Sequence, residues 1–69
     1  MEFKVGQRVK VRGDVMDCTD HLDGLIGTIV IPGKDDCRVE FSRADVGERS
    51  PTDWWIWNYN ITPVGDADG

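Results

Sequence analysis

The amino-acid sequence predicts a small all-β domain, a five-stranded barrel with one single-turn 3₁₀ connector before its last strand. A chain of 69 residues has room for one domain only. Short segments of alternating apolar and polar residues recur along it, which is the period of a half-buried strand. Segments rich in glycine, proline and aspartate separate them, as turns and loops do. We expect the barrel to occupy residues 1–64 and residues 65–69 to form a disordered acidic tail.

The first strand is predicted over residues 3–12, and a long loop follows it. Val5, Val9 and Val11 alternate with polar residues in that strand, and Gly6 predicts a bend near its start. Residues 13–24 are polar and lack a sustained helical stripe, which indicates a partly packed loop. Its expected apolar anchors are Val15, Met16 and Leu22.

The next two strands form a predicted hairpin. Residues 25–31 are mostly β-branched and apolar, whereas residues 32–36 contain the Pro-Gly and Asp-Asp composition of a turn. Alternation resumes over residues 37–42 and places three apolar side chains on one face. These are Cys37, Val39 and Phe41. The short connection favours antiparallel pairing of the two strands.

The last two strands follow a second polar loop, predicted over residues 43–53. Residues 54–57 form the fourth strand, and residues 58–60 are long enough only for a single 3₁₀ turn. The final strand covers residues 61–64. Because Pro63 has no N–H to donate, this strand is expected at a sheet edge.

All three tryptophans of the chain fall within the fourth strand. Successive side chains of a strand point to opposite faces, so Trp54 and Ile56 face one way and Trp55 and Trp57 the other. We expect the first pair to join Val9, Val11, Ile29 and Phe41 in the core. Trp55 and Trp57 are then the predicted aromatic anchors for a partner, with Tyr59 as a contributor, because exposed tryptophan is enriched in interface hot spots.

Two segments resemble a known family pattern. Residues 5–11 (VGQRVKV) and 24–30 (GLIGTIV) are similar to the paired glycine and valine signature of SH3-like barrels. The likeness extends over residues 4–64 and includes KOW-type domains, Mib/HERC-type repeats, the PsaE accessory subunit of photosystem I and small stand-alone bacterial and phage proteins. The resemblance implies the barrel fold, in which Gly24 and Gly27 permit tight backbone geometry. It does not fix a function, because one fold serves many.

Charge bears on the class of partner. The net charge of −5 disfavours a non-specific binder of phosphate backbones, which draws on clustered lysine and arginine. A basic stripe is nevertheless predicted on the outward face of the first strand, and it defines an alternative nucleic-acid face. Its members are Lys4, Arg8, Lys10 and Arg12. The competing interpretation is that these side chains form cross-strand ion pairs with acids such as Glu40 or Asp53.

The first loop carries an aspartate at every third position. The four residues are Asp14, Asp17, Asp20 and Asp23. Their spacing does not match the calcium loop of the EF-hand, so a solvated acidic surface that steers a basic partner is the favoured interpretation.

A chemical site is not predicted. Cys18, His21 and Cys37 would form a thiolate–imidazole cluster if the first loop folded over the hairpin, but structural zinc sites normally show two local ligand pairs. We expect a buried Cys37, a free Cys18 in the loop, no metal and no cofactor. No nucleophile elbow or phosphate loop occurs in the sequence, so we expect no enzymatic activity.

These observations favour a non-enzymatic protein-binding module, an accessory subunit or phage-type modulator that docks on a larger, basic protein. A nucleic-acid-binding barrel and a self-assembling or structural subunit, including an oligomer, are the two alternatives. No apolar run is long enough for a membrane span and the N-terminus has no signal-peptide character, so a cytoplasmic location is expected.

Overall fold

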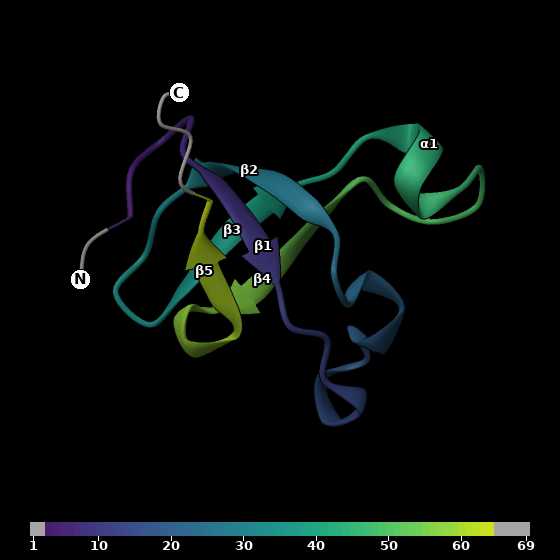
Figure 1. Cartoon of the computed structure of the whole chain (residues 1–69), viewed down its shortest axis with the longest axis horizontal. Coiled ribbons are helices and arrows are strands. Elements are labelled where there is room, and N and C mark those ends of the chain that lie inside the picture. Colours follow the sequence, from purple (N-terminus) through teal and green to yellow (C-terminus); the bar gives the residue numbers. More distant parts are fainter. Residues whose placement is uncertain (1–2, 65–69) are drawn as a thin grey trace.

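Five strands form one antiparallel sheet in the computed structural model, which describes residues 3–64 (Figure 1). Hydrogen bonds connect them in the order β4-β3-β2-β1-β5. Their bounds are β1 Arg8–Val11, β2 Ile26–Ile31, β3 Asp36–Glu40, β4 Asp53–Trp57 and β5 Ile61–Pro63. The prediction of an all-β, five-stranded fold is confirmed. The sheet curls so that β1 and β5 pass in front of β3 and β4, but within residues 3–64 it does not close, and β4 and β5 are its edges (Figure 1).

Four single helical turns lie between the strands. The 3₁₀ turn η3, Asn58–Asn60, connects β4 to β5 and confirms the predicted connector. The first loop contains two further 3₁₀ turns, η1 Val15–Asp17 and η2 Asp20–Leu22, and the second loop contains α1, Arg43–Val46. The sequence interpretation treated both loops as irregular. Two of these turns have side-chain caps: Asp14 accepts a hydrogen bond from the Met16 N–H in η1, and Ser42 accepts one from the Asp45 N–H in α1, whereas η2 has no side-chain cap.

One predicted boundary is wrong by several residues and another by a single residue. The first strand begins at Arg8 rather than at residue 3, because Gly6 has a φ of 88° and turns the chain before the strand starts. Lys4 therefore does not lie on β1, as the basic stripe required. The second polar loop ends earlier than predicted, because Asp53 already belongs to β4. Residues 65–69, predicted to form a tail, lie outside the described residues.

The core lies between the two halves of the curled sheet. It consists of nine buried apolar residues: Val9, Val11, Leu22, Ile29, Cys37, Val39, Phe41, Ile56 and Ile61. Trp54, also predicted for the core, is only partly buried against it. The other five core residues that the sequence predicted are confirmed: Val9, Val11, Ile29, Phe41 and Ile56. Of the three predicted loop anchors, Leu22 is correct. Val15 and Met16 are wrong, since they are 73% and 89% exposed.

The predicted hairpin is the pairing of β2 with β3. Ile29 lies opposite Val39, and a bulge follows between Ile29 and Ile31. Gly27 lies so close to β3 that a Cβ atom built on it would be 2.5 Å from Val39 Cγ1 and 2.8 Å from Phe41 Cε1. The glycine is therefore required for close packing. Gly24, by contrast, has a φ of +83°, which returns the first loop to β2.

Candidate functional site

The side chains of β4 alternate as its sequence predicts. Ile56 is buried and Trp54 is partly buried on the inner face, whereas Trp55 and Trp57 on the outer face are 47% and 41% exposed. The alternation follows from the strand period, and the inner pair fills the space next to the core. Trp55 and Trp57 thus stay at the surface although a tryptophan side chain is usually well buried.

Tyr59 extends this aromatic surface beyond the strand. It lies on η3, is 67% exposed, and its ring is parallel to that of Trp57 within 8°, with 6.0 Å between the centroids. Such offset aromatic pairs are mutually attractive. We call Trp55, Trp57 and Tyr59 the aromatic face. The structure therefore brings together the three aromatic residues predicted to bind a partner.

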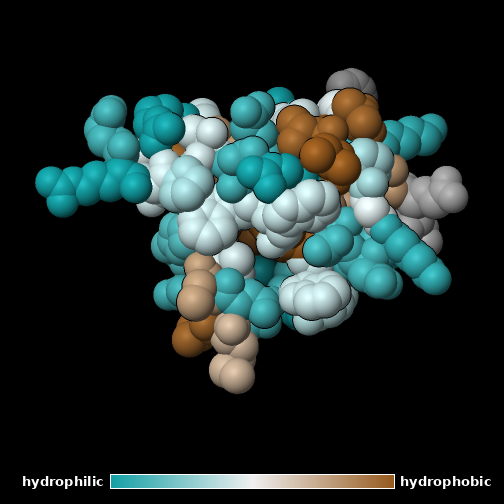
Figure 2. Space-filling view, turned by 180° about the vertical axis from the view of Figure 1, so that it is seen from behind, coloured by the Kyte–Doolittle hydropathy of each residue, from teal (hydrophilic) through white to brown (hydrophobic). Residues whose placement is uncertain are grey.

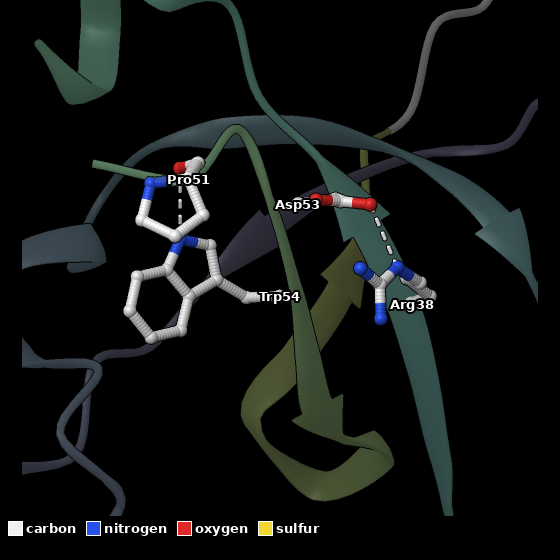
Figure 3. Close-up of polar contacts among 4 residues, drawn as sticks. All are labelled: Arg38, Pro51, Asp53 and Trp54. Carbon is white, nitrogen blue, oxygen red and sulfur yellow. Dashed lines mark hydrogen bonds and ion pairs between the residues drawn. The ribbon is translucent and has the colours of Figure 1, made fainter. Parts of the chain in front are cut away.

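An arginine on the neighbouring strand β3 contacts Trp55, at one end of the aromatic face. Arg38 lies opposite Trp55, with its guanidinium carbon 5.7 Å from the ring centroid, within the range of a cation–π contact. Its Nε donates a 2.7 Å hydrogen bond to Asp53 Oδ2 (Figure 3). That hydrogen bond lowers the pKa of Asp53 below its ordinary value, and the positive charge of Arg38 adds to the effect while partial desolvation opposes it.

Figure 3 also shows Trp54 on the opposite side of β4 from the Arg38–Asp53 pair. Its indole Nε1 donates to the backbone oxygen of Pro51 at 3.2 Å. Trp54 is therefore oriented by its own loop, whereas Trp55 is oriented by a side chain of β3. Arg38 is a residue that the sequence interpretation missed, because its contact with Trp55 depends on the register of β3 against β4.

The outer face of β3 and β4 carries an excess of negative charge. Asp36 and Glu40 flank Arg38 on β3, and they lie opposite Trp57 and Asp53 respectively. The single guanidinium is already paired with Asp53. Ile31, 47% exposed, lies opposite Arg38 on β2. On the side of the molecule hidden in Figure 1, brown apolar side chains gather beside pale ones of intermediate hydropathy, with hydrophilic teal side chains around them (Figure 2).

The four loop aspartates divide into two pairs. Asp14 caps η1, and Asp23 Oδ1 accepts a 2.9 Å hydrogen bond from the Gly13 N–H, so both stabilise the loop itself. Asp17 and Asp20 are exposed. The ring of His21, on η2, contacts Trp54 edge-on with 5.0 Å between the centroids. This contact brings the acidic loop next to β4, on the side opposite the exposed indoles.

The predicted basic residues do not form one continuous stripe. Arg8 and Lys10 are exposed on β1, whereas Lys4 precedes the turn. The Arg12 side chain donates from Nε and Nη2 to Asn60 Oδ1, at 3.2 and 3.1 Å. The predicted alternative, ion pairs with Glu40 or Asp53, is wrong for these four residues: within residues 3–64 the only ion pair is that between Arg38 and Asp53. Lys10 and Arg12 instead line an open pocket of about 340 Å³ with Val11, Asp23, Gly24 and Thr62.

The cysteines and the histidine are not arranged around a common point. Cys18 is exposed and Cys37 is buried, as predicted. Cys37 Sγ donates to Asn58 Oδ1 at 3.1 Å, while His21 contacts Trp54. In the part of the chain that the structure describes, no three side chains of His, Cys, Asp or Glu lie close enough to hold a metal ion.

Two asparagines of η3 have roles that the sequence interpretation missed. Asn58 Nδ2 donates to the backbone oxygens of Gly33 and Lys34, which ties η3 to the β2–β3 turn beside the aromatic face. Asn60, buried, accepts the guanidinium of Arg12 through Oδ1. No local pattern signals these links, because the partners lie 24 to 48 residues away in the sequence.

Comparisons with known proteins supply no assignment. No protein-family model matches the chain, and neither the curated proteins nor the solved structures contain a significant relative. Among residues 3–64 there is also no helix with the length and apolar character needed to cross a membrane. The functional argument therefore depends on the site itself.

Proposed function

We propose that this protein is a non-enzymatic binding module that docks on a larger, basic protein through the aromatic face, as an accessory subunit or modulator of that partner. The observation that carries the proposal is the exposure of Trp55, Trp57 and Tyr59 on one surface, at 47%, 41% and 67%. Exposure of this size leaves a large apolar surface of each indole in water. In an interface, however, such side chains are the ones whose truncation most often costs about 2 kcal/mol or more of binding free energy.

The surroundings of the aromatic face favour a basic partner. Asp36 and Glu40 lie beside it without an ion-pair partner among residues 3–64, and the whole chain has a net charge of −5. Charges around an apolar centre mainly select the partner and raise the association rate. The exposed carboxylates of Asp17 and Asp20 add to the same field from the first loop.

The nucleic-acid alternative receives less support from the arrangement. Binding of a single strand combines stacking aromatics with a track of positive charge in one groove. Here Trp55 and Trp57 lie on β4, whereas Arg8 and Lys10 lie on β1, and β3 and β2 separate these two strands in the sheet. Asp36 and Glu40 stand between them on β3 and would repel phosphates. Arg12 reaches η3, the turn that carries Tyr59, but its guanidinium is bound to Asn60 Oδ1.

A capture experiment with matched variants tests the proposal. The tagged protein and the Trp55→Ala/Trp57→Ala variant are passed through a bacterial lysate, after circular dichroism has shown that both are folded. We expect the wild type to retain a specific protein that the variant loses. The affinity measured on that purified protein should fall by about 30-fold or more, which corresponds to a loss of about 2 kcal/mol.

The control removes exposed apolar surface elsewhere. In the Val15→Ala/Met16→Ala variant, the two most exposed apolar side chains on η1 are truncated, far from β4 in sequence. This variant should retain the partner. If the wild type and the Trp55→Ala/Trp57→Ala variant retain the same set of proteins, the aromatic face is structural and the proposed function is wrong.

A further inference from the structure

The two edges of the open sheet differ in the backbone groups that they present. The edge of a sheet carries N–H and C=O groups without a neighbouring strand, which makes it a template for an added strand. In this sheet the edges are β4 and β5. Which of them can accept a strand depends on which residues turn their backbone groups outward.

The edge of β5 offers no free N–H within the strand. The Arg12 N–H donates to the Asn60 oxygen and the Val64 N–H donates to the Arg8 oxygen, so in this antiparallel ladder residues 60, 62 and 64 face β1. Ile61 and Pro63 therefore face outward. The Ile61 N–H is donated to the Asn58 oxygen at the end of η3, and Pro63 has no N–H. This edge is protected against strand addition.

The edge of β4 has no such protection. The Phe41 N–H donates to the Thr52 oxygen and the Asn58 N–H to the Asp35 oxygen, and the register between these two pairs has no shift. Trp54 and Ile56 consequently turn their backbone groups to β3, whereas Trp55 and Trp57 turn theirs outward. Within residues 3–64, no backbone hydrogen bond outside the strand ladders uses the N–H of Trp55 or Trp57 or the oxygen of Trp55, and the register turns these groups away from β3.

The residues with outward backbone groups are also those with exposed indoles. Trp55 and Trp57 alternate with the inward residues, so a strand placed beside β4 would pair with their backbone and contact their rings on the outer face. Strand addition of this kind obtains affinity from the main chain and specificity from alternate side chains. The occupant that fits such an edge is therefore an extended segment of polypeptide.

Charge determines which segment fits. On the outer face, the edge strand carries Asp53, which is paired with Arg38. One strand further from the edge, β3 carries Asp36 and Glu40, which have no ion-pair partner within residues 3–64, so the field at this edge is negative. The first loop, with exposed Asp17 and Asp20, adjoins β4 on the other side through the His21–Trp54 contact. A second copy of β4 is a poor occupant, because its five residues Asp53–Trp57 contain an acid and no base. The complementary segment alternates apolar and basic residues.

We propose that the edge of β4 binds an extended, basic segment of a partner protein by adding it to the sheet as a sixth strand. The inference rests on the proposed function and specifies how the partner is held. The backbone of Trp55 and Trp57 pairs with the added strand, and their indoles contact its apolar side chains. Its basic side chains alternate to the other face, the side of the first loop with Asp17 and Asp20.

The test removes a single backbone donor and leaves the indole in place. A chain of 69 residues is accessible to chemical synthesis by ligation at Cys37, so Trp55 can be replaced by N-methyl-Trp55. Because the Trp55 N–H faces away from β3, the fold should be retained, which circular dichroism and thermal unfolding verify. N-methyl-Lys34, in the exposed β2–β3 turn, is the matched control.

The probe is a synthetic eight-residue peptide of alternating valine and lysine. Its control is a peptide of the same composition that is N-methylated at alternate residues.

We expect the wild type and N-methyl-Lys34 to bind the peptide, with slowed amide exchange at Trp55 and Trp57, and neither to bind the N-methylated peptide. N-methyl-Trp55 should bind about tenfold or more weakly, since it loses a hydrogen bond and places a methyl group in the path of the strand. Equal binding by N-methyl-Trp55 overturns the inference, as does an absence of peptide binding to the wild type. Concentration-dependent dimerisation that N-methyl-Trp55 abolishes, without peptide binding, assigns the edge to a second copy instead.

The proposed function and the inference of strand addition are tested by different outcomes. If N-methyl-Trp55 binds the peptide normally but Trp55→Ala/Trp57→Ala does not, the aromatic face binds without strand addition, so only the inference is lost. If a lysate partner is retained equally by the wild type and by Trp55→Ala/Trp57→Ala, the proposed function itself is wrong, whatever the peptide does.

Discussion

At the scale of single residues, Arg38 connects charge to the aromatic face. Its guanidinium binds Asp53 Oδ2 and lies over the Trp55 ring, so one side chain fixes the position of two others. Both partners of the ion pair are partly exposed, with 34% of each side chain accessible. Such surface pairs contribute little to folding stability. We infer that the importance of Arg38 lies in orienting Trp55 for binding.

The titration of Asp53 tests this pair. We predict that Arg38→Gln raises the pKa of Asp53 towards its ordinary value, because the hydrogen bond and the charge that lower it are removed. A carboxyl-detected NMR titration measures the midpoint. In the wild type, the stabilisation from this pair is fully present above the unfolded pKa of Asp53 and is lost as the pH falls through the lower, folded value. An unchanged midpoint in Arg38→Gln would show that the ion pair does not form in solution.

At the scale of elements, the alternation of inward and outward side chains in β4 and in the β2–β3 hairpin was predictable. It depends on a two-residue period that the sequence displays directly. That period alone places Trp55 and Trp57 on the face opposite Trp54 and Ile56, but it does not decide which pair faces outward, because a shift of one residue in register reverses the faces. The turns η1, η2 and α1 were not predictable in this way, since a single turn is too short to show a repeating pattern, and a capping side chain, Asp14 or Ser42, marks only η1 and α1. The contacts of Arg38 and Asn58 with other elements depend on register, which no local pattern contains.

The close approach of β2 to β3 at Gly27 predicts the effect of a substitution there. Gly27→Ala should lower the free energy of unfolding by about 1–3 kcal/mol, because its Cβ would overlap Val39 and Phe41 in the core. Urea denaturation followed by tryptophan fluorescence measures the change. Thr62→Ala, on the exposed face of β5, should change it by about 0.5 kcal/mol or less. Equal effects of the two substitutions would mean that β2 can move away from β3 without loss.

At the scale of the whole molecule, the first loop is part of the fold rather than an appendage. A chain of this size rarely has more than about 3–5 kcal/mol of folding free energy, so each core residue matters. Leu22, from the first loop, is fully buried, and its neighbour His21 contacts Trp54 of β4. Hydrogen bonds from the Gly24 N–H to the Val11 oxygen and from the Val11 N–H to the Leu25 oxygen fasten the end of the loop to β1. The acidic surface is thus held in place relative to the β4 edge by the same core that stabilises the barrel.

The last prediction follows from this coupling. Leu22→Ala should lower the free energy of unfolding by about 2–5 kcal/mol, the cost of a leucine-sized cavity, and leave much of the protein unfolded at 25 °C. Met16→Ala, six residues earlier in the same loop and 89% exposed, should have almost no effect. Urea denaturation monitored separately by tryptophan fluorescence and by far-ultraviolet circular dichroism measures both variants. In Leu22→Ala the unfolding midpoints of the two signals should shift together, because loop and sheet share one core. A shift confined to one signal would show that the loop unfolds by itself and cannot fix the acidic residues beside β4.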